Sequence, residues 1–100
     1  MPKYIVLFNF TDQGIRNIRE ISLRDKGRET RQRVGAMGVS GEFYLTQGPY
    51  DLVFMGEAPN DEVMTQAMLY VGSRGNRRTL TMRAFTEEEA DRIIGGLPSS

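Results

Sequence analysis

Residues 4–10 read Tyr4-Ile5-Val6-Leu7-Phe8-Asn9-Phe10, a run in which only Asn9 is polar. β-Branched and aromatic residues favour strands, and an apolar run without alternation is typical of a strand that is covered on both faces. Tyr4, Val6, Phe8 and Phe10 would point to one side of such a strand, and Ile5 and Leu7 to the other. We therefore predict a central strand with two apolar faces.

The segments after this strand predict a helix and then a hairpin. Thr11 to Gly14 is typical of a helix start, and an apolar or small residue then recurs every three or four positions, at Leu23, Gly27, Thr30, Val34 and Met37. This spacing predicts one helix that ends at Gly38, and its small middle residues predict a close approach to the sheet. Residues 42–47 and 52–55 read as strands around the turn residues Gly48 to Asp51.

The second half of the chain again predicts a helix followed by a strand, and then a short final helix. Asn60 is a candidate N-cap for a helix that ends near Gly72 or Gly75, with Asp61 and Glu62 in its first turn. Residues 79–85 alternate and predict a strand with one buried face, which would carry Leu80, Met82 and Ala84. Thr86 and Glu89 form a capping-box pattern, so we predict a short final helix that ends at Gly95 and Gly96.

The order of these elements, β-α-β-β-α-β, predicts an α+β fold of the ferredoxin-like kind, with an extra C-terminal helix. Its four-stranded antiparallel sheet would carry two helices on one face. We expect one domain over residues 1–97 and a frayed tail over 98–100.

The second face of this sheet would be apolar and uncovered. We expect a second copy of the chain to cover it, because a patch of that size is rare on a monomer. The alternative is that the C-terminal helix folds back over the face within the same chain.

The composition limits the classes of function that the chain could have. The 100 residues contain 13 Lys+Arg and 13 Asp+Glu, and no Cys, His or Trp. These absences exclude disulfides, the usual Cys/His zinc sites, thiolate nucleophiles and His-based pairs, so we expect no metal and no cofactor and lean away from an enzyme. The zero net charge argues against nucleic acid, and the short apolar run at the N-terminus argues against a membrane span. A cytoplasmic location is the resulting expectation.

The predicted topology gathers polar residues at one rim, where four strand ends, the start of the first helix and the end of the second helix meet. A helix start beside two arginines could hold a small anion. The candidate binding residues are Asn9, Gln13, Arg16, Tyr50, Asp51 and Arg78. The alternative is that Thr11 caps the helix and that Asp51 only hydrogen-bonds backbone.

Several motifs in this order resemble the GYD domain family of small bacterial proteins. They are residues 10–14, residues 43–51 with Gly48, Tyr50 and Asp51 as the Gly-x-Tyr-Asp element, and residues 75–86. The resemblance covers nearly the whole chain and is weakest over residues 21–39. It implies a ferredoxin-like subunit of the dimeric α/β-barrel type. Related dimeric barrels include oxygenases, isomerases and haem-degrading enzymes, but these commonly use His or Trp.

Three hypotheses about function follow. The first is a homo-oligomeric small-molecule-binding or accessory protein with a polar site at the rim, whose partners are itself and a small anionic ligand. The second is a cofactor-independent dimeric-barrel enzyme that uses Asp51 or Tyr50 next to a closed apolar pocket. The third is a purely structural interaction module, which is favoured if the rim residues satisfy one another.

Overall fold

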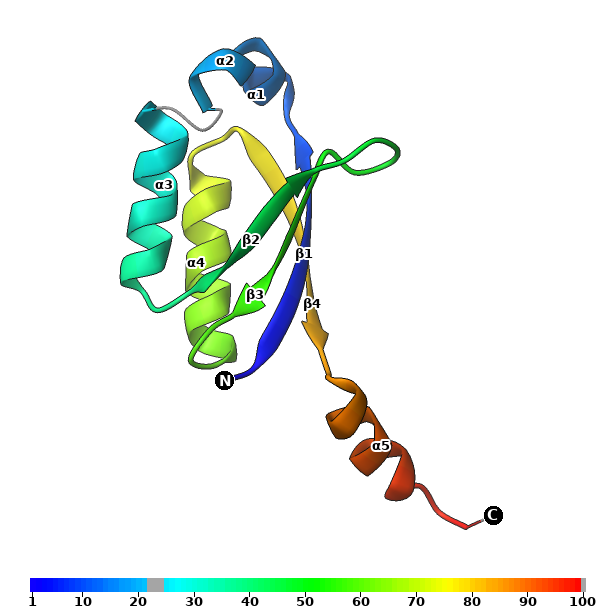
Figure 1. Cartoon of the computed structure of the whole chain (residues 1–100). Coiled ribbons are helices and arrows are strands. Elements are labelled where there is room, and N and C mark those ends of the chain that lie inside the picture. The colour runs from blue at the N-terminus through cyan, green and yellow to red at the C-terminus, as the bar shows by residue number, and fades with distance from the viewer. Residues whose placement is uncertain (22–24, 100) are drawn as a thin grey trace.

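The computed structural model describes residues 1–21 and 25–99. The elements follow in the order β1 (Lys3–Phe10), α1 (Asp12–Arg16), α2 (Ile18–Ile21), α3 (Asp25–Ala36), β2 (Ser40–Leu45), β3 (Leu52–Glu57), α4 (Asp61–Ser73), β4 (Arg77–Ala84) and α5 (Glu87–Gly95). Figure 1 shows α3 and α4 side by side on one face of the sheet.

The sheet has the strand order β2-β3-β1-β4, and every neighbouring pair is antiparallel. β1 is therefore central, as its two apolar faces predict. The α+β ferredoxin-like fold class is confirmed. The register sets Val6 opposite both Phe54 of β3 and Thr81 of β4, which fixes the side of the sheet on which each residue lies.

The core lies between the helices and the helix-facing side of the sheet. β1 contributes Tyr4, Val6 and Phe8, of which Val6 is fully buried. α4 contributes Met64, Ala67 and Val71, and Asn60 caps its start by accepting a hydrogen bond from the Val63 N–H at 2.9 Å. The predicted N-cap and apolar face of this helix are confirmed.

The first helical region differs from the single helix that the sequence predicts. α1 ends at Arg16 and is capped by Asn17, whose backbone N–H donates to the Gln13 carbonyl, and α2 and α3 follow as separate segments. Thr30 and Val34 are buried as the stripe predicts, whereas Leu23 lies outside the described residues. The expected close approach to the sheet is also wrong, since a cavity lies between α3 and the sheet.

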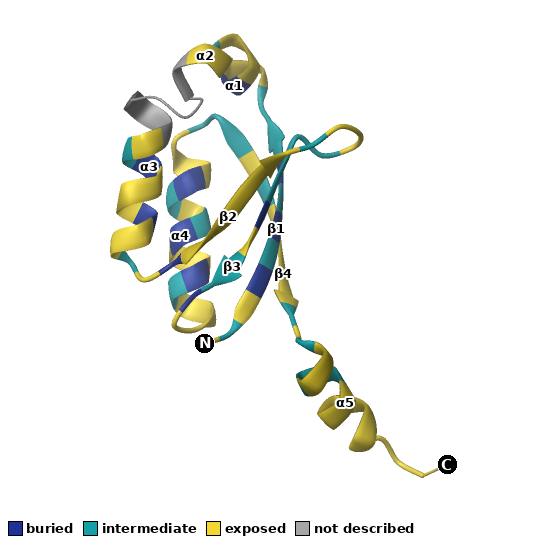
Figure 2. Cartoon of the chain, in the orientation of Figure 1, coloured by how far each residue is buried: buried dark blue, intermediate teal, exposed yellow. Residues whose placement is uncertain are grey.

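No helix of the described residues covers the second face of the sheet (Figure 2). We call it the open face, and its apolar residues are Ile5, Leu7, Tyr44, Val53, Met55, Leu80, Met82 and Ala84. Leu80 and Met82 do share one side of β4, but that side is the open one, with exposed fractions of 49% and 40%. The prediction that this side is buried is wrong for the single chain, because alternation shows which residues share a side and not which side the helices cover.

The last helix, α5, extends from the end of β4 away from the sheet (Figure 1). Its predicted capping box is present: the Glu89 N–H donates to the Thr86 hydroxyl, and the Thr86 N–H donates to the Glu89 carboxylate. Ile93, Ile94 and Leu97 remain exposed. Within this chain α5 therefore leaves the open face uncovered.

Candidate functional site

Asp51 is the best-defined of the rim residues. Its carboxylate accepts a hydrogen bond from the Phe10 N–H at 2.8 Å, its own N–H donates to the Phe8 carbonyl at 2.8 Å, and its carbonyl accepts from the Thr46 N–H at 2.9 Å. One residue thus continues the pairing of β1 with β3 and closes the β2–β3 hairpin. The arrangement matches the structural alternative for this side chain.

The start of α1 is anchored to the turn between α4 and β4. The Thr11 hydroxyl accepts from the Gly14 N–H at 3.0 Å, which makes it the helix cap, and donates to the Gly75 carbonyl at 2.6 Å. The Gln13 amide donates to the Arg74 carbonyl and to the Asn76 side chain at 3.2 and 3.0 Å. The predicted neighbours do meet here, and their polar groups are engaged with one another.

The other four candidate residues are less engaged. Asn9 of β1 stands opposite Arg78 of β4 in the register, Arg16 ends α1, and half-buried Tyr50 precedes Asp51. Within the described part of the chain, the Asn9, Arg16, Tyr50 and Arg78 side chains make no hydrogen bond. Arg16 and Arg78 are both exposed, so their charges face solvent.

The Gly-x-Tyr-Asp element has a clear structural role in the hairpin. Gly48 has φ +113°, a conformation that side chains with a Cβ rarely adopt. The Tyr50 carbonyl then accepts from the Thr46 hydroxyl at 2.6 Å, two residues before β3 begins. The motif therefore shapes the loop and positions Asp51 against β1.

A cavity of about 610 Å³ lies on the helix-facing side of the sheet, and none of the six candidate rim residues is among its described lining residues. α3, α4 and all four strands contribute to its walls, and its polar lining is dominated by Arg28, Arg31 and Arg77. None of the described lining residues is Asp or Glu. The enzyme hypothesis requires a carboxylate beside an apolar pocket, and Asp51 is not among the lining residues. Sequence reasoning missed this cavity, although the small residues in the stripe of an arginine-rich helix were its signal.

The side chains with shifted pKa values owe these shifts to burial or to contacts that hold the fold together. Burial and a hydrogen bond to Asp61 raise the pKa of Tyr4, whose ring also lies 5.6 Å from the Arg83 guanidinium. The ammonium of Lys3, 2.6 Å away, lowers the pKa of Glu57. Burial lowers the pKa of Arg77, although a guanidinium stays charged at neutral pH. No described helix is long and apolar enough to cross a membrane, and no described cluster of acidic, His or Cys side chains could hold a metal.

The family model for the GYD domain matches residues 4–94, from the start of β1 into α5. The chain belongs to the GYD domain family. A relative from Thermus thermophilus is 33% identical over 87 residues, which cover 85% of this chain and 90% of that protein. Its name is glutamine synthetase and cystathionine beta-lyase binding protein.

Solved structures show that this GYD chain has a fold found elsewhere. TTHA0845 from Thermus thermophilus superposes with a TM-score of 0.52 at 24% identity, over 86% of this chain and 95% of that one. The hypothetical protein PHS023 from Pyrococcus horikoshii superposes with a TM-score of 0.51 at 23% identity, over 87% and 93% of the two chains. These likenesses support the fold class.

Proposed function

We propose that this GYD protein is a homo-oligomeric accessory protein, which binds another protein and pairs with a second copy of itself through its open face. The observation that carries the proposal is the exposure of large apolar side chains on one face of the sheet. Tyr44, Met55 and Leu80 are each about half exposed, at 49%, 50% and 49%. Large contiguous apolar patches are rare on the surfaces of monomeric proteins, and they commonly mark the sites of protein–protein contact.

A second copy is the occupant that this surface fits best. The charged groups on the open face balance in number: Lys3 pairs with Glu57, and the Glu42 carboxylate on β2 is matched in net charge by the Arg78 guanidinium on β4. A two-fold partner presents the same surface, so a face with little net charge can meet its copy without like-charge repulsion. Apolar side chains can then cover each other across the interface.

The experiment for this step is light scattering coupled to size exclusion. We expect a mass at least twice the 11.3 kDa of one chain. Leu80→Glu places a charge in the interface and should shift the mass toward that of a single chain. Leu69→Glu is the matched control, because Leu69 is 69% exposed on α4. A wild-type mass of one chain at every concentration would refute the self-pairing.

The accessory part of the proposal is supported by the relative's name. That protein is named as a binding protein for glutamine synthetase and cystathionine beta-lyase, and it shares 33% of aligned residues with this chain. Calorimetric titration of this protein with each of the two purified enzymes from its own organism tests the transfer of that role. Saturable heat with either enzyme supports it, and the absence of heat with both removes this pair of partners.

A small-anion site at the rim is the second candidate. The observation in its favour is that Arg16 and Arg78 are exposed and make no ion pair within the described residues. The full proposed set is Asn9, Gln13, Arg16, Tyr50, Asp51 and Arg78, although Gln13 and Asp51 already bond to the fold. Thermal-shift measurements with phosphate and acetate test it. Stabilisation that Arg78→Ala abolishes supports the site, and no stabilisation by either anion counts against it.

A further inference from the structure

The cavity on the helix-facing side of the sheet has the size of a small-molecule site. Its volume is about 610 Å³, within the roughly 300–1,000 Å³ usual for ligand pockets. α3 forms one wall, with Thr30 and Val34 facing inward, and α4 contributes Met68 and Val71. The open face lies on the other side of the same sheet, so this cavity is separate from the proposed pairing surface.

Three aromatic rings form the apolar floor. The Phe43 ring centre lies 5.9 Å from that of Phe8 and 4.8 Å from that of Phe54. Phe8 and Phe54 are buried, whereas Phe43 is 36% exposed although its strand position faces the helices. The cavity over the ring accounts for this exposure. An apolar group bound there would cover the ring and gain the free energy of that burial.

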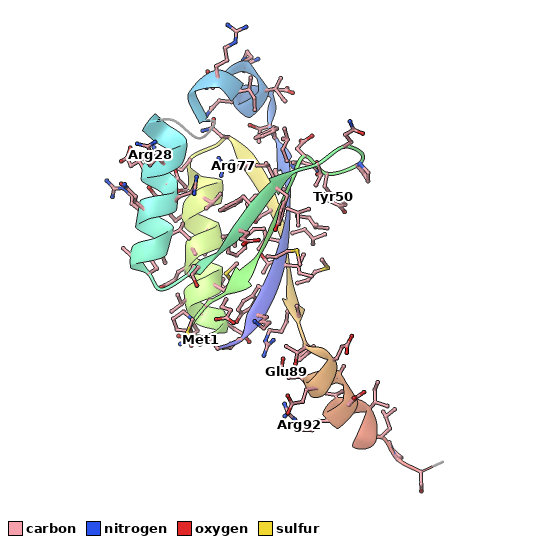
Figure 3. All side chains as sticks on the ribbon, in the orientation of Figure 1. Met1, Arg28, Tyr50, Arg77, Glu89 and Arg92 are labelled. Carbon is pink, nitrogen blue, oxygen red and sulfur yellow. The ribbon has the colours of Figure 1, made fainter. Side chains whose placement is uncertain are left out.

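The polar lining is cationic. Arg28 and Arg31 lie on α3, and Arg77 is the first residue of β4. Figure 3 labels Arg28 and Arg77, which lie toward the same end of the helical layer. The lining contains no carboxylate among the described residues, and the nearby carboxylate of Glu29 bonds to Arg33, a residue outside the lining, at 3.1 Å. Guanidinium groups beside apolar walls attract a carboxylate or a phosphate, which they bind through charge-assisted hydrogen bonds.

We propose that this cavity binds a small organic anion, whose apolar body lies on the Phe43 ring and whose carboxylate or phosphate head is held by Arg28 and Arg31. Both parts of the site come from the same feature of the sequence. α3 has small residues where a core helix normally has large ones, and its flank is rich in arginine. The small residues leave the space, and the arginines supply the charge.

The test is a set of titrations followed by amide chemical shifts. The probes are 4-phenylbutyrate, octanoate and phenyl phosphate, and the neutral controls are 4-phenylbutanol and octanol. We expect saturable shifts at Val39, Gly41 and Val71, which line the cavity, and none at Met55 on the open face. The anions should bind at least about tenfold more tightly than the alcohols, because only they can use the guanidinium groups. The phosphate and carboxylate arms distinguish the two head groups.

Two charge-reversal variants distinguish a direct contact of the anion with the cavity arginines from a general electrostatic effect of the positively charged helix. Arg31→Glu should weaken the best-bound anion by about tenfold or more. Arg33→Glu makes the same change of charge on the same helix, outside the cavity. It also breaks the ion pair with Glu29, so some loss of affinity is expected, well below that of Arg31→Glu. The proposal is overturned if no probe gives saturable shifts at the cavity, if the alcohols bind as tightly as the anions, or if the two variants weaken binding equally. Backbone amide spectra verify that each variant is folded.

Discussion

The Asp51 carboxylate holds the end of β1, accepting the hydrogen bond that the Phe10 N–H donates at 2.8 Å. Phe10 is the last residue of β1, so this N–H would otherwise lack a partner in the β1–β3 pairing. β3 begins only at Leu52, so the Asp51 carboxylate accepts the hydrogen bond that a backbone carbonyl of a longer β3 would accept. The Asp of the Gly-x-Tyr-Asp element therefore makes a structural contact in this chain.

Asp51→Ala should accordingly lower the free energy of unfolding. A hydrogen bond to a charged acceptor contributes about 1.5–3 kcal/mol. Asp51→Asn is the matched control, because its amide oxygen still accepts the bond and most of the stability should return. Urea unfolding measures both variants. An Asp51→Ala protein as stable as the wild type would show that the contact contributes nothing, and would favour the ligand-binding hypothesis for this side chain.

Gly14 marks a second tight contact at the rim. A Cβ on this buried glycine would lie 2.0 Å from the Asn76 carbonyl oxygen, which is backbone and cannot rotate away. Gly14→Ala should destabilise the protein by about 2 kcal/mol or more, in the range of overpacked cores. Gly35→Ala in α3 meets nothing within 4 Å and should stabilise by up to about 1 kcal/mol, as alanine does in an open helical position. Thermal and urea unfolding compare the pair, and equal effects at the two sites would contradict the packing at Gly14.

Tyr4 predicts a loss of stability at high pH. Burial and the hydrogen bond to Asp61 raise its folded-state pKa above the ordinary 10.0. Its contribution is therefore fully present below about pH 10 and is lost as the pH rises through the raised folded-state pKa. Tyr4→Phe should be less stable than the wild type at pH 7 by about 1 kcal/mol and should lose less stability above pH 10.

Tyr70→Phe is the control for that experiment. The Tyr70 hydroxyl is buried and makes no hydrogen bond within the described residues, so its removal should be neutral or stabilising at pH 7. The measurement is urea unfolding at pH 7, 9 and 10.5. A wild-type profile that Tyr4→Phe leaves unchanged would contradict the linkage.

Local patterns predicted the fold because they depend on neighbours in sequence. β1, the hairpin, the Asn60 cap and the Thr86–Glu89 capping box follow from strand propensity and from hydrogen bonds that span three residues. The break after Arg16 was not predictable, since Asn17 is a weak stop signal and the anchoring of α1 depends on Asn76, far away in the chain. Pairings across such separations leave little trace in a single sequence.

The candidate site was only partly predictable for a related reason. Topology alone brought the rim residues together, and Gln13 does meet Asn76. It could not show that Asp51 is already bonded to backbone, because a carboxylate near a strand end is equally compatible with a ligand. The basic cavity depends on how far α3 stands from the sheet. Small residues in the stripe are compatible with a close approach of the helix to the sheet as well as with a cavity, so the residue types alone do not specify that distance.

α5 gives the last prediction, which concerns the proposed pairing. Its cap is intact, yet Ile93, Ile94 and Leu97 are 50%, 61% and 66% exposed, on the helix that follows β4. If a second copy covers the open face, this apolar side of α5 extends over that copy and adds to the buried area. Ile94→Gln should then weaken self-association severalfold in sedimentation equilibrium.

Arg92→Gln, a substitution of a nearby α5 residue to the same side chain, is the control and should change the association constant by less than about twofold. Ile94 contacts little within its own chain, so Ile94→Gln should leave the unfolding of the isolated subunit unchanged. This combination separates an interface residue from a core residue. If Ile94→Gln lowers folding stability at low protein concentration, Ile94 belongs to the subunit's own core. If Ile94→Gln leaves association unchanged, α5 is not part of the interface. The pairing through the open face is then judged by the Leu80→Glu variant alone.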